Sequence, residues 1–171
     1  MEYKTKKIVL HVDNILREID QLSYKLGETV LEGTPSKDAV STDSDDTLDG
    51  DILRNLLDAR DAQIRKRLAF CLTECDVEEI HDCDCERHVL VYEVSVPEDA
   101  RAISMRAALT AMHDYMVKGT LMDWYNRIGT AYGATLAVEV QQLESRIIDT
   151  FRLLSIQRTQ SNVIYHTYHR R

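Results

Sequence analysis

Potential metal ligands gather in one short stretch of the chain, HDCDCERH. They are His81, Cys83, Cys85 and His88. Imidazole and thiolate groups are the ligands that zinc prefers, and in an extended backbone His81, Cys83 and Cys85 would share one face. The spacing nevertheless fits no common zinc template, and neither Gly nor Pro is present to form the usual knuckle turn. We therefore favour a charged connecting segment without a cofactor, and keep a small metal site as the alternative.

The two other cysteines, Cys71 and Cys75, lie just upstream. All four cysteines thus fall within one stretch, unlike the spread of a secreted disulfide scaffold, so we expect reduced thiols. A cysteine nucleophile is disfavoured because the carboxylates around Cys83 and Cys85 oppose formation of a thiolate.

No other catalytic constellation is present. The chain has no GxSxG, no phosphate-binding glycine loop, no HExxH and no Glu-x-x-His pair on its helical segments. His113 and Asp114 fall within a helical pattern, where such polar residues are more often exposed or at an interface than catalytic. The sequence predicts a protein that is not an enzyme.

The elements expected around these residues are mainly helical. At 171 residues and 44% hydrophobic, the chain can form a single domain, residues 1–171, with one core. Apolar residues at 3.6-residue spacing predict a four-helix bundle-like fold with one or two short strands. The predicted helices span 6–27, about 49–72 with Asp49 or Asp51 as the cap, 97–129, and 131–156.

The first predicted helix has an a/d pattern that starts at Ile8 and ends at Leu26. We favour an ordinary bundle helix over a coiled-coil partner helix. The third predicted helix begins at Pro97, which suits a first turn. At Gly119 we expect either a bend or close contact with another backbone, and Trp124 and Tyr125 should end its packed face.

Residues 89–96, VLVYEVSV, alternate and are β-branched, which predicts a strand. A strand needs a partner. Two candidates are the tail at 163–169, VIYHTYH, and a strand from another subunit.

Charge is distributed unevenly. The formal net charge is −8 and the pI is near 5.2, which argues against a phosphate-binding nucleic-acid partner. The loop 28–51 is polar and acidic, although its spacing does not match an EF-hand. The tail 157–171 is basic and aromatic. Both segments are predicted to be extended interaction arms, with the tail docking on the acidic loop of its own chain or a neighbour. The alternatives are a solvated linker for the loop and a frayed terminus for the tail. The candidate interaction residues are Asp43, Asp45, Asp46, Arg158, Tyr165, Tyr168, Arg170 and Arg171.

No apolar run is long enough for a membrane span, and the first residues do not form a signal peptide. We expect synthesis and assembly in the cytoplasm, without membrane binding.

Three passages carry a resemblance to a known family. They are DGDILRNLLDARDAQIRKRL, VYEVSVPED and MRAALTAMHDYMVKGTLMDWY. A further likeness is the last predicted helix, which leads into an Arg-rich end in FRLLSIQRTQSNVIYHTYHRR. Over residues 49–171 the chain resembles the head-to-tail adaptor, or head-completion, proteins of tailed bacteriophages and related prophage structural proteins. It departs from them in the first predicted helix, the acidic loop and the cysteine-rich connection.

The resemblance implies a virion structural protein of the neck or tail. Such a subunit would form an oligomeric ring that binds the portal and other neck or tail proteins and lets DNA pass without sequence-specific binding. Two other classes remain open on the sequence: a free-standing cytoplasmic helical interaction module, and a small metal-binding protein using the residues of HDCDCERH.

Overall fold

The computed structural model describes residues 3–30, 41–73, 89–97 and 102–168, with side chains for 4–26, 41–73, 89–96 and 104–153. Its elements, in chain order, are β1 (Tyr3–His11), α1 (Val12–Val30), α3 (Thr47–Leu68), β2 (Val89–Pro97), α4 (Ala102–Arg127) and α5 (Tyr132–Tyr168). The chain is mainly α with a short two-stranded sheet, as the sequence predicts.

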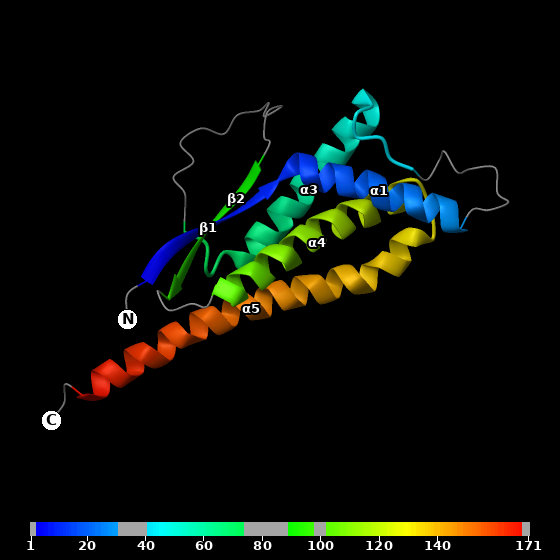
Figure 1. Cartoon of the computed structure of the whole chain (residues 1–171). Coiled ribbons are helices and arrows are strands. Elements are labelled where there is room, and N and C mark those ends of the chain that lie inside the picture. Colours follow the sequence, from blue (N-terminus) through cyan, green and yellow to red (C-terminus); the bar gives the residue numbers. More distant parts are fainter. Residues whose placement is uncertain (1–2, 31–40, 74–88, 98–101, 169–171) are drawn as a thin grey trace.

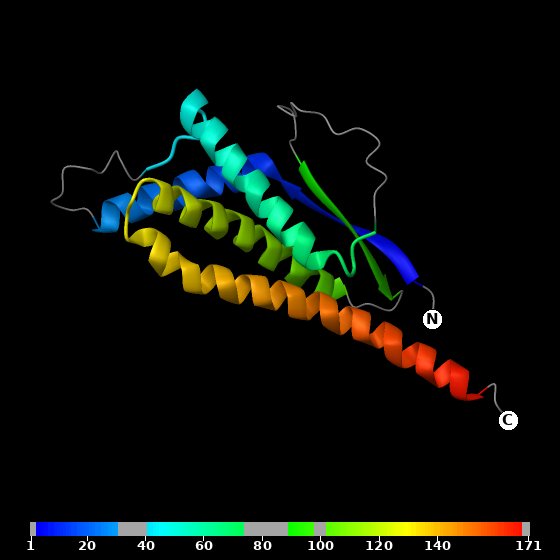
Figure 2. The ribbon, with the colours of Figure 1, turned by 180° about the vertical axis from the view of Figure 1, so that it is seen from behind.

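Helix α4 lies at the centre of the fold, and α1, α3 and α5 pack around it (Figure 1). Seen from behind, α3 crosses α4 while α5 runs alongside it (Figure 2). Because neighbours surround it, α4 buries residues on several faces, including Met112, Tyr115, Val117 and Leu121. Trp124 and Tyr125 are 5% and 0% exposed, so they do belong to the packed part of this helix.

The two strands pair antiparallel, with Ile8 opposite Tyr92 and Leu10 opposite Leu90. These four side chains are buried, which gives each strand one core face at a period of two residues. The predicted helix over 6–27 is therefore wrong at its start, where residues 6–11 are strand. The a/d pattern misled because Ile8 and Val12 fit both periodicities, whereas buried Leu10 fits only the strand.

The partner of β2 is neither of the two segments considered from the sequence. Residues 163–168 of the tail belong to helix α5, and β2 pairs within its own chain. On its other edge, Leu72 bridges Val94, and the Thr73 amide donates to the Glu93 carbonyl at 2.8 Å. Backbone groups on both edges of β2 thus have partners.

The start of α4 differs from the prediction. Pro97 ends β2 instead of opening the helix, and α4 begins at Ala102. The helix continues through Gly119 as one element. The atoms nearest to this glycine belong to the side chain of Arg60, whereas the sequence predicted a bend or close contact with another backbone. A methyl group at Gly119 would lie 3.1 Å from Cδ of Arg60.

The turn between α4 and α5 depends on Gly129, whose φ of 74° lies in the left-handed region. The Thr130 amide donates to the Tyr125 carbonyl at 3.0 Å, the long bond of a Schellman motif that closes α4. Helix α5 then runs antiparallel to α4 (Figure 1) and reaches Tyr168, well past the predicted end at 156. Residues 157–168 are helical, and no described helix is long and apolar enough to cross a membrane.

We predict that Gly50→Ala destabilises the fold, although alanine favours helices. A methyl group at Gly50 would lie 2.5 Å from the backbone oxygen of Ser44, which cannot move aside without displacing the loop before α3. The expected loss in unfolding free energy is about 1–3 kcal/mol, measured by urea denaturation. The exposed first-turn variant Thr47→Ala is the control, and equal stability of the two variants would contradict this packing.

Candidate interaction surfaces

Asp20, on α1, holds the described part of the acidic loop in place. Its carboxylate accepts from the Thr42 hydroxyl at 2.6 Å, from the Ser44 amide at 3.2 Å and from the Ser44 hydroxyl. The Ser23 hydroxyl accepts from the Thr42 amide at 3.0 Å. Hydrogen bonds to a carboxylate are roughly twice as strong as neutral ones, so residues 42–44 are tied firmly to α1.

Asp46 caps α3, where the sequence predicted Asp49 or Asp51. Its carboxylate accepts from the amides of Leu48 at 2.8 Å and Asp49 at 3.3 Å. A carboxylate at this position also meets the positive end of the helix dipole. Asp46 therefore has the capping role that the sequence predicted for Asp49 or Asp51.

The other two predicted interaction residues of this loop differ in their roles. Asp43 closes a turn by accepting from the Asp45 amide at 3.1 Å. Asp45 is exposed, and so is Asp51, whose side chain is 76% exposed and 3.8 Å from Arg54. We call this surface, Asp43, Asp45 and Asp51, the acidic end of the molecule.

The predicted basic residues lie elsewhere. Arg158, Tyr165 and Tyr168 belong to the last turns of α5, which project beyond the body of the fold (Figures 1 and 2). Arg170 and Arg171 lie outside the described residues. We call residues 152–168 of α5 the basic arm, because this stretch holds arginines and no acidic residue.

The acidic end and the basic arm stand at opposite ends of the molecule (Figure 1). Rigid helices separate them, so the described part of the arm cannot reach the acidic end of its own chain. Docking of the tail on a neighbouring chain, or on its own, stays a prediction.

The sequence-predicted metal candidates His81, Cys83, Cys85 and His88 lie outside the described residues. Within the described ranges, no group of three or more His, Cys, Asp or Glu side chains could hold a metal ion. His113, on α4, has Nδ1 3.7 Å from a carboxylate oxygen of Glu18 on α1. This contact links two helices and brings no nucleophile to the imidazole.

An ion pair that the sequence did not predict joins α3 to α4, between a buried arginine and a partly buried aspartate. The guanidinium of Arg60 donates from Nε at 2.6 Å and from Nη2 at 2.5 Å to the two carboxylate oxygens of Asp123. The side chain of Arg60 is only 9% exposed. Burial would lower the pKa of Arg60, but the hydrogen bonds and charge of Asp123, with a contribution from Tyr115, raise it overall. The guanidinium is therefore charged and its charge is compensated.

The alternation of acids and bases around Arg60 predicted only a solvated helix face. The signal that could have revealed the pair is Gly119, since a glycine inside a long helix marks the close approach of a neighbour. The Arg60 guanidinium also lies 5.9 Å from the centre of the Tyr115 ring, where it makes a cation–π contact.

A second polar cluster connects α3 to the sheet. The Tyr92 hydroxyl donates to Asp61, whose other oxygen accepts from Arg65 Nε at 2.7 Å. Arg65 also donates to the Val91 carbonyl at 2.9 Å and stacks 4.5 Å from the Tyr92 ring centre. Burial, and then the charge of Asp61, raise the pKa of Tyr92, so it remains a hydrogen-bond donor.

Four further polar groups on α4 are buried: the hydroxyls of Tyr115, Thr120 and Tyr125 and the indole N–H of Trp124. None has a hydrogen-bonding partner among the described residues. Burial raises the pKa of Tyr125 to about 12, with a smaller contribution from Tyr132. Neither of the grooves described next includes these groups, so we assign them no ligand.

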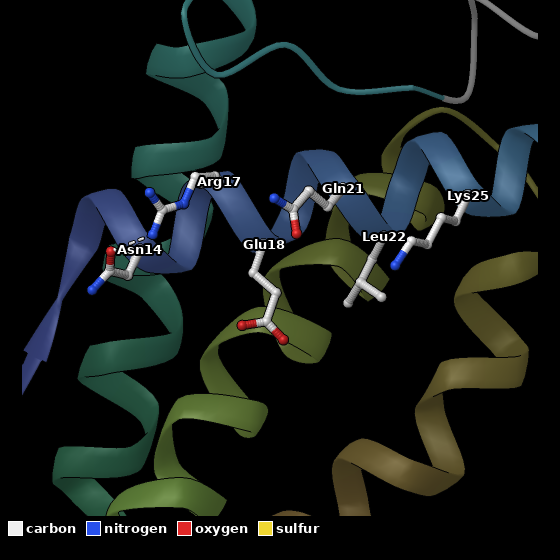
Figure 3. Close-up of a pocket in the computed structure, with 6 residues that line it drawn as sticks. All are labelled: Asn14, Arg17, Glu18, Gln21, Leu22 and Lys25. Carbon is white, nitrogen blue, oxygen red and sulfur yellow. Dashed lines mark hydrogen bonds between the residues drawn. The ribbon is translucent and has the colours of Figure 1, made fainter.

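Two surface grooves are lined by described residues alone. The first, of about 450 Å³, lies along α1 and is shown in Figure 3. Its lining residues are Asn14, Arg17, Glu18, Gln21, Leu22 and Lys25. Arg17 donates to Asn14 at 2.8 Å, and the lining mixes positive and negative groups, so the groove selects no single ligand charge. The second, of about 600 Å³, lies on the outer face of α5.

Comparisons of the chain with protein-family models, with curated proteins and with solved structures gave no significant match.

We predict strong coupling between Arg60 and Asp123. Asp123→Leu would leave a buried guanidinium without its counter-charge, which costs about 3–5 kcal/mol of unfolding free energy. Arg60→Leu with Asp123→Leu should cost much less than the sum of the single variants. Urea denaturation of the four proteins gives the coupling energy.

The control is the exposed pair of Lys118 and Glu139, 2.7 Å apart. Glu139→Gln should change stability by less than about 1 kcal/mol. Additive effects at Arg60 and Asp123 would show that the pair does not act as a unit.

We predict that Cys71 is unreactive in the folded protein. Its side chain is buried, and burial raises the pKa of its thiol to about 11. Since the thiolate is the reactive form, the thiol stays protonated at neutral pH and reacts only as the pH approaches 11 or the chain unfolds. In a variant with Cys75, Cys83 and Cys85 changed to serine, a thiol reagent at pH 8 should label Cys71 in urea and not in buffer; rapid labelling in buffer would contradict its burial.

Proposed function

We propose that the chain is a non-enzymatic virion structural protein, an adaptor or connector subunit of a tailed bacteriophage. In this proposal its copies form a ring between portal and tail, through which DNA passes. The observation that carries the proposal is the placement of the acidic end and the basic arm at opposite ends of a rigid helical body (Figure 1). The sequence resemblance over residues 49–171 supplies the family.

Opposite charges at opposite ends favour head-to-tail association. An interface between two different surfaces of the same chain is heterologous, and it builds rings where the rotation closes. The basic arm of one subunit would meet the acidic end of the next. Both surfaces are built on helices, because Asp20 and the cap at Asp46 fix the first and α5 carries the second.

The arm itself supports assembly. Helix α5 has 37 residues and α4 has 26, so at 1.5 Å per residue α5 is longer by about 16 Å. An isolated helical segment this short is marginal in water. Contact with a neighbouring subunit would stabilise it.

The overall charge suits a DNA channel. The formal net charge of the chain is −8, and its last 20 residues hold four arginines and no acidic residue. The rest of the chain is therefore strongly acidic. A lumen lined by that surface would repel phosphates and let the genome pass without sticking.

A free-standing helical interaction module is the alternative function. The two functions predict different assemblies, so the oligomeric state separates them. A ring subunit should form a high-order oligomer, alone or with a phage portal protein, whereas a module should stay at low order. A metal-binding role requires bound zinc, which elemental analysis of the purified protein would detect.

We predict that charge reversal at the acidic end weakens ring assembly. Asp45→Lys with Asp51→Lys should shift the mass distribution toward smaller species, measured by light scattering and by electron microscopy with the portal protein. Arg158→Asp should act in the same direction. High salt should imitate both, because the Debye length is about 8 Å at physiological ionic strength and 3 Å at 1 M.

The matched controls separate charge from folding. Asp46 is left unchanged because it caps α3. Combining the reversed acids with Arg158→Asp should restore part of the assembly, since the attraction is re-formed with exchanged signs. Unchanged rings in both reversed variants would overturn the head-to-tail arrangement, and failure to associate with any portal or neck protein would overturn the phage role.

A further inference from the structure

The outer face of α5 exposes two large apolar side chains at the ends of a polar groove. Val138 and Leu153 are 60% and 65% exposed. The groove residues are Val138, Gln141, Gln142, Ser145, Arg146, Asp149, Thr150 and Leu153. At 100° per residue these positions lie opposite the buried stripe of Val140, Ile147 and Phe151.

The order of these residues is self-complementary about the point between Ser145 and Arg146. Val138 and Leu153 are equally distant from that point, and so are Gln142 and Asp149, and Gln141 and Thr150. In an antiparallel pair of identical helices related by a two-fold axis, positions at equal distance on either side of the axis face each other. Each apolar end would then meet the apolar end of the other copy.

We infer that this face binds the same face of a second copy of the chain, with the two α5 helices antiparallel and the two-fold axis beside Ser145. The contact goes beyond the proposed function and uses neither the acidic end nor the basic arm's terminal residues. Val138 would pack on the partner's Leu153, twice by symmetry, and the small side chain of Ser145 would let the helices approach closely at the axis.

The charges on this face fit a second copy. Arg146 would lie within one helical turn of the partner's Asp149, so two ion pairs would flank the axis.

The position of α5 leaves room for such a partner. It is the outermost helix in both views, with the rest of the described fold on its other side (Figures 1 and 2). A single helix pair is smaller than the ~1,600 Å² of a standard interface. We therefore expect a dissociation constant in the micromolar range, with dimers near 100 µM and monomers at high dilution.

Cysteine cross-linking tests the pairing register. In the background where Cys75, Cys83 and Cys85 are serine, Ser145→Cys should form disulfide-linked dimers on mild oxidation. Val138→Cys alone and Leu153→Cys alone should not, since neither position faces itself, but a mixture of the two should give the heterodimer. Equal cross-linking of all variants, or none by any of them, would overturn the register.

Charge exchange tests the symmetry independently. Arg146→Asp alone and Asp149→Arg alone place like charges across the axis and should each raise the dissociation constant at least about tenfold. The double exchange should restore dimerisation. These exposed positions leave the fold intact, which the melting temperature checks. A wild-type chain that sediments as a monomer at 100 µM, with or without the charged ends reversed, would overturn the inference.

Discussion

The ion pair between Arg60 and Asp123 is the contact on which the arrangement of the helices depends. Helix α4 packs against α1, α3 and α5, and its apolar contacts with them are not directional. A bidentate bond between a guanidinium and a carboxylate permits little sliding because both donors must stay aligned. Gly119 provides the space in which Arg60 can lie against α4. The pair therefore fixes how α3 sits on the central helix.

The position of α3 in turn fixes the acidic end and the sheet. At its start, the Asp46 cap and the bonds from residues 42–44 to Asp20 hold the acidic end against α1. Along its length, Asp61 binds Tyr92 and Arg65 binds the Val91 carbonyl, which ties the sheet to the same helix. Helix α5 packs on the other side of α4. Oppositely charged surfaces are thus held apart by helices, and a rigid separation of this kind favours contact between chains over contact within one chain.

Much of the fold follows from periodicity, and one of the errors occurs where two periodicities coincide. Long apolar stripes predicted α3, α4, α5 and most of α1, and alternation predicted β2. Strand β1 was missed because Ile8 and Val12 satisfy a helical spacing, and the pairing that makes it a strand depends on Leu90 and Tyr92, some 80 residues away. The N-cap of α3 also depends on contacts that are distant in the sequence. Three nearby aspartates can each cap this helix, and the bonds of Thr42 and Ser44 to Asp20 determine that Asp46 does so. The buried role of Arg60 was unpredictable from local charge alternation, since exposed and buried arginines look alike in a helix sequence.

The two kinds of contact inferred for this chain overlap only at the start of the basic arm, at Leu153, and can therefore combine. Head-to-tail contact between the basic arm and the acidic end, taken alone, builds a ring or a filament, whereas the two-fold contact across α5 builds only dimers. Together they generate two rings stacked face to face, or paired filaments. The head-to-tail contact depends on exposed charges and weakens with salt, while the α5 contact also buries apolar side chains at Val138 and Leu153. Salt concentration should therefore separate the two levels of assembly, because raising it dissociates rings into dimers before it dissociates dimers into single chains.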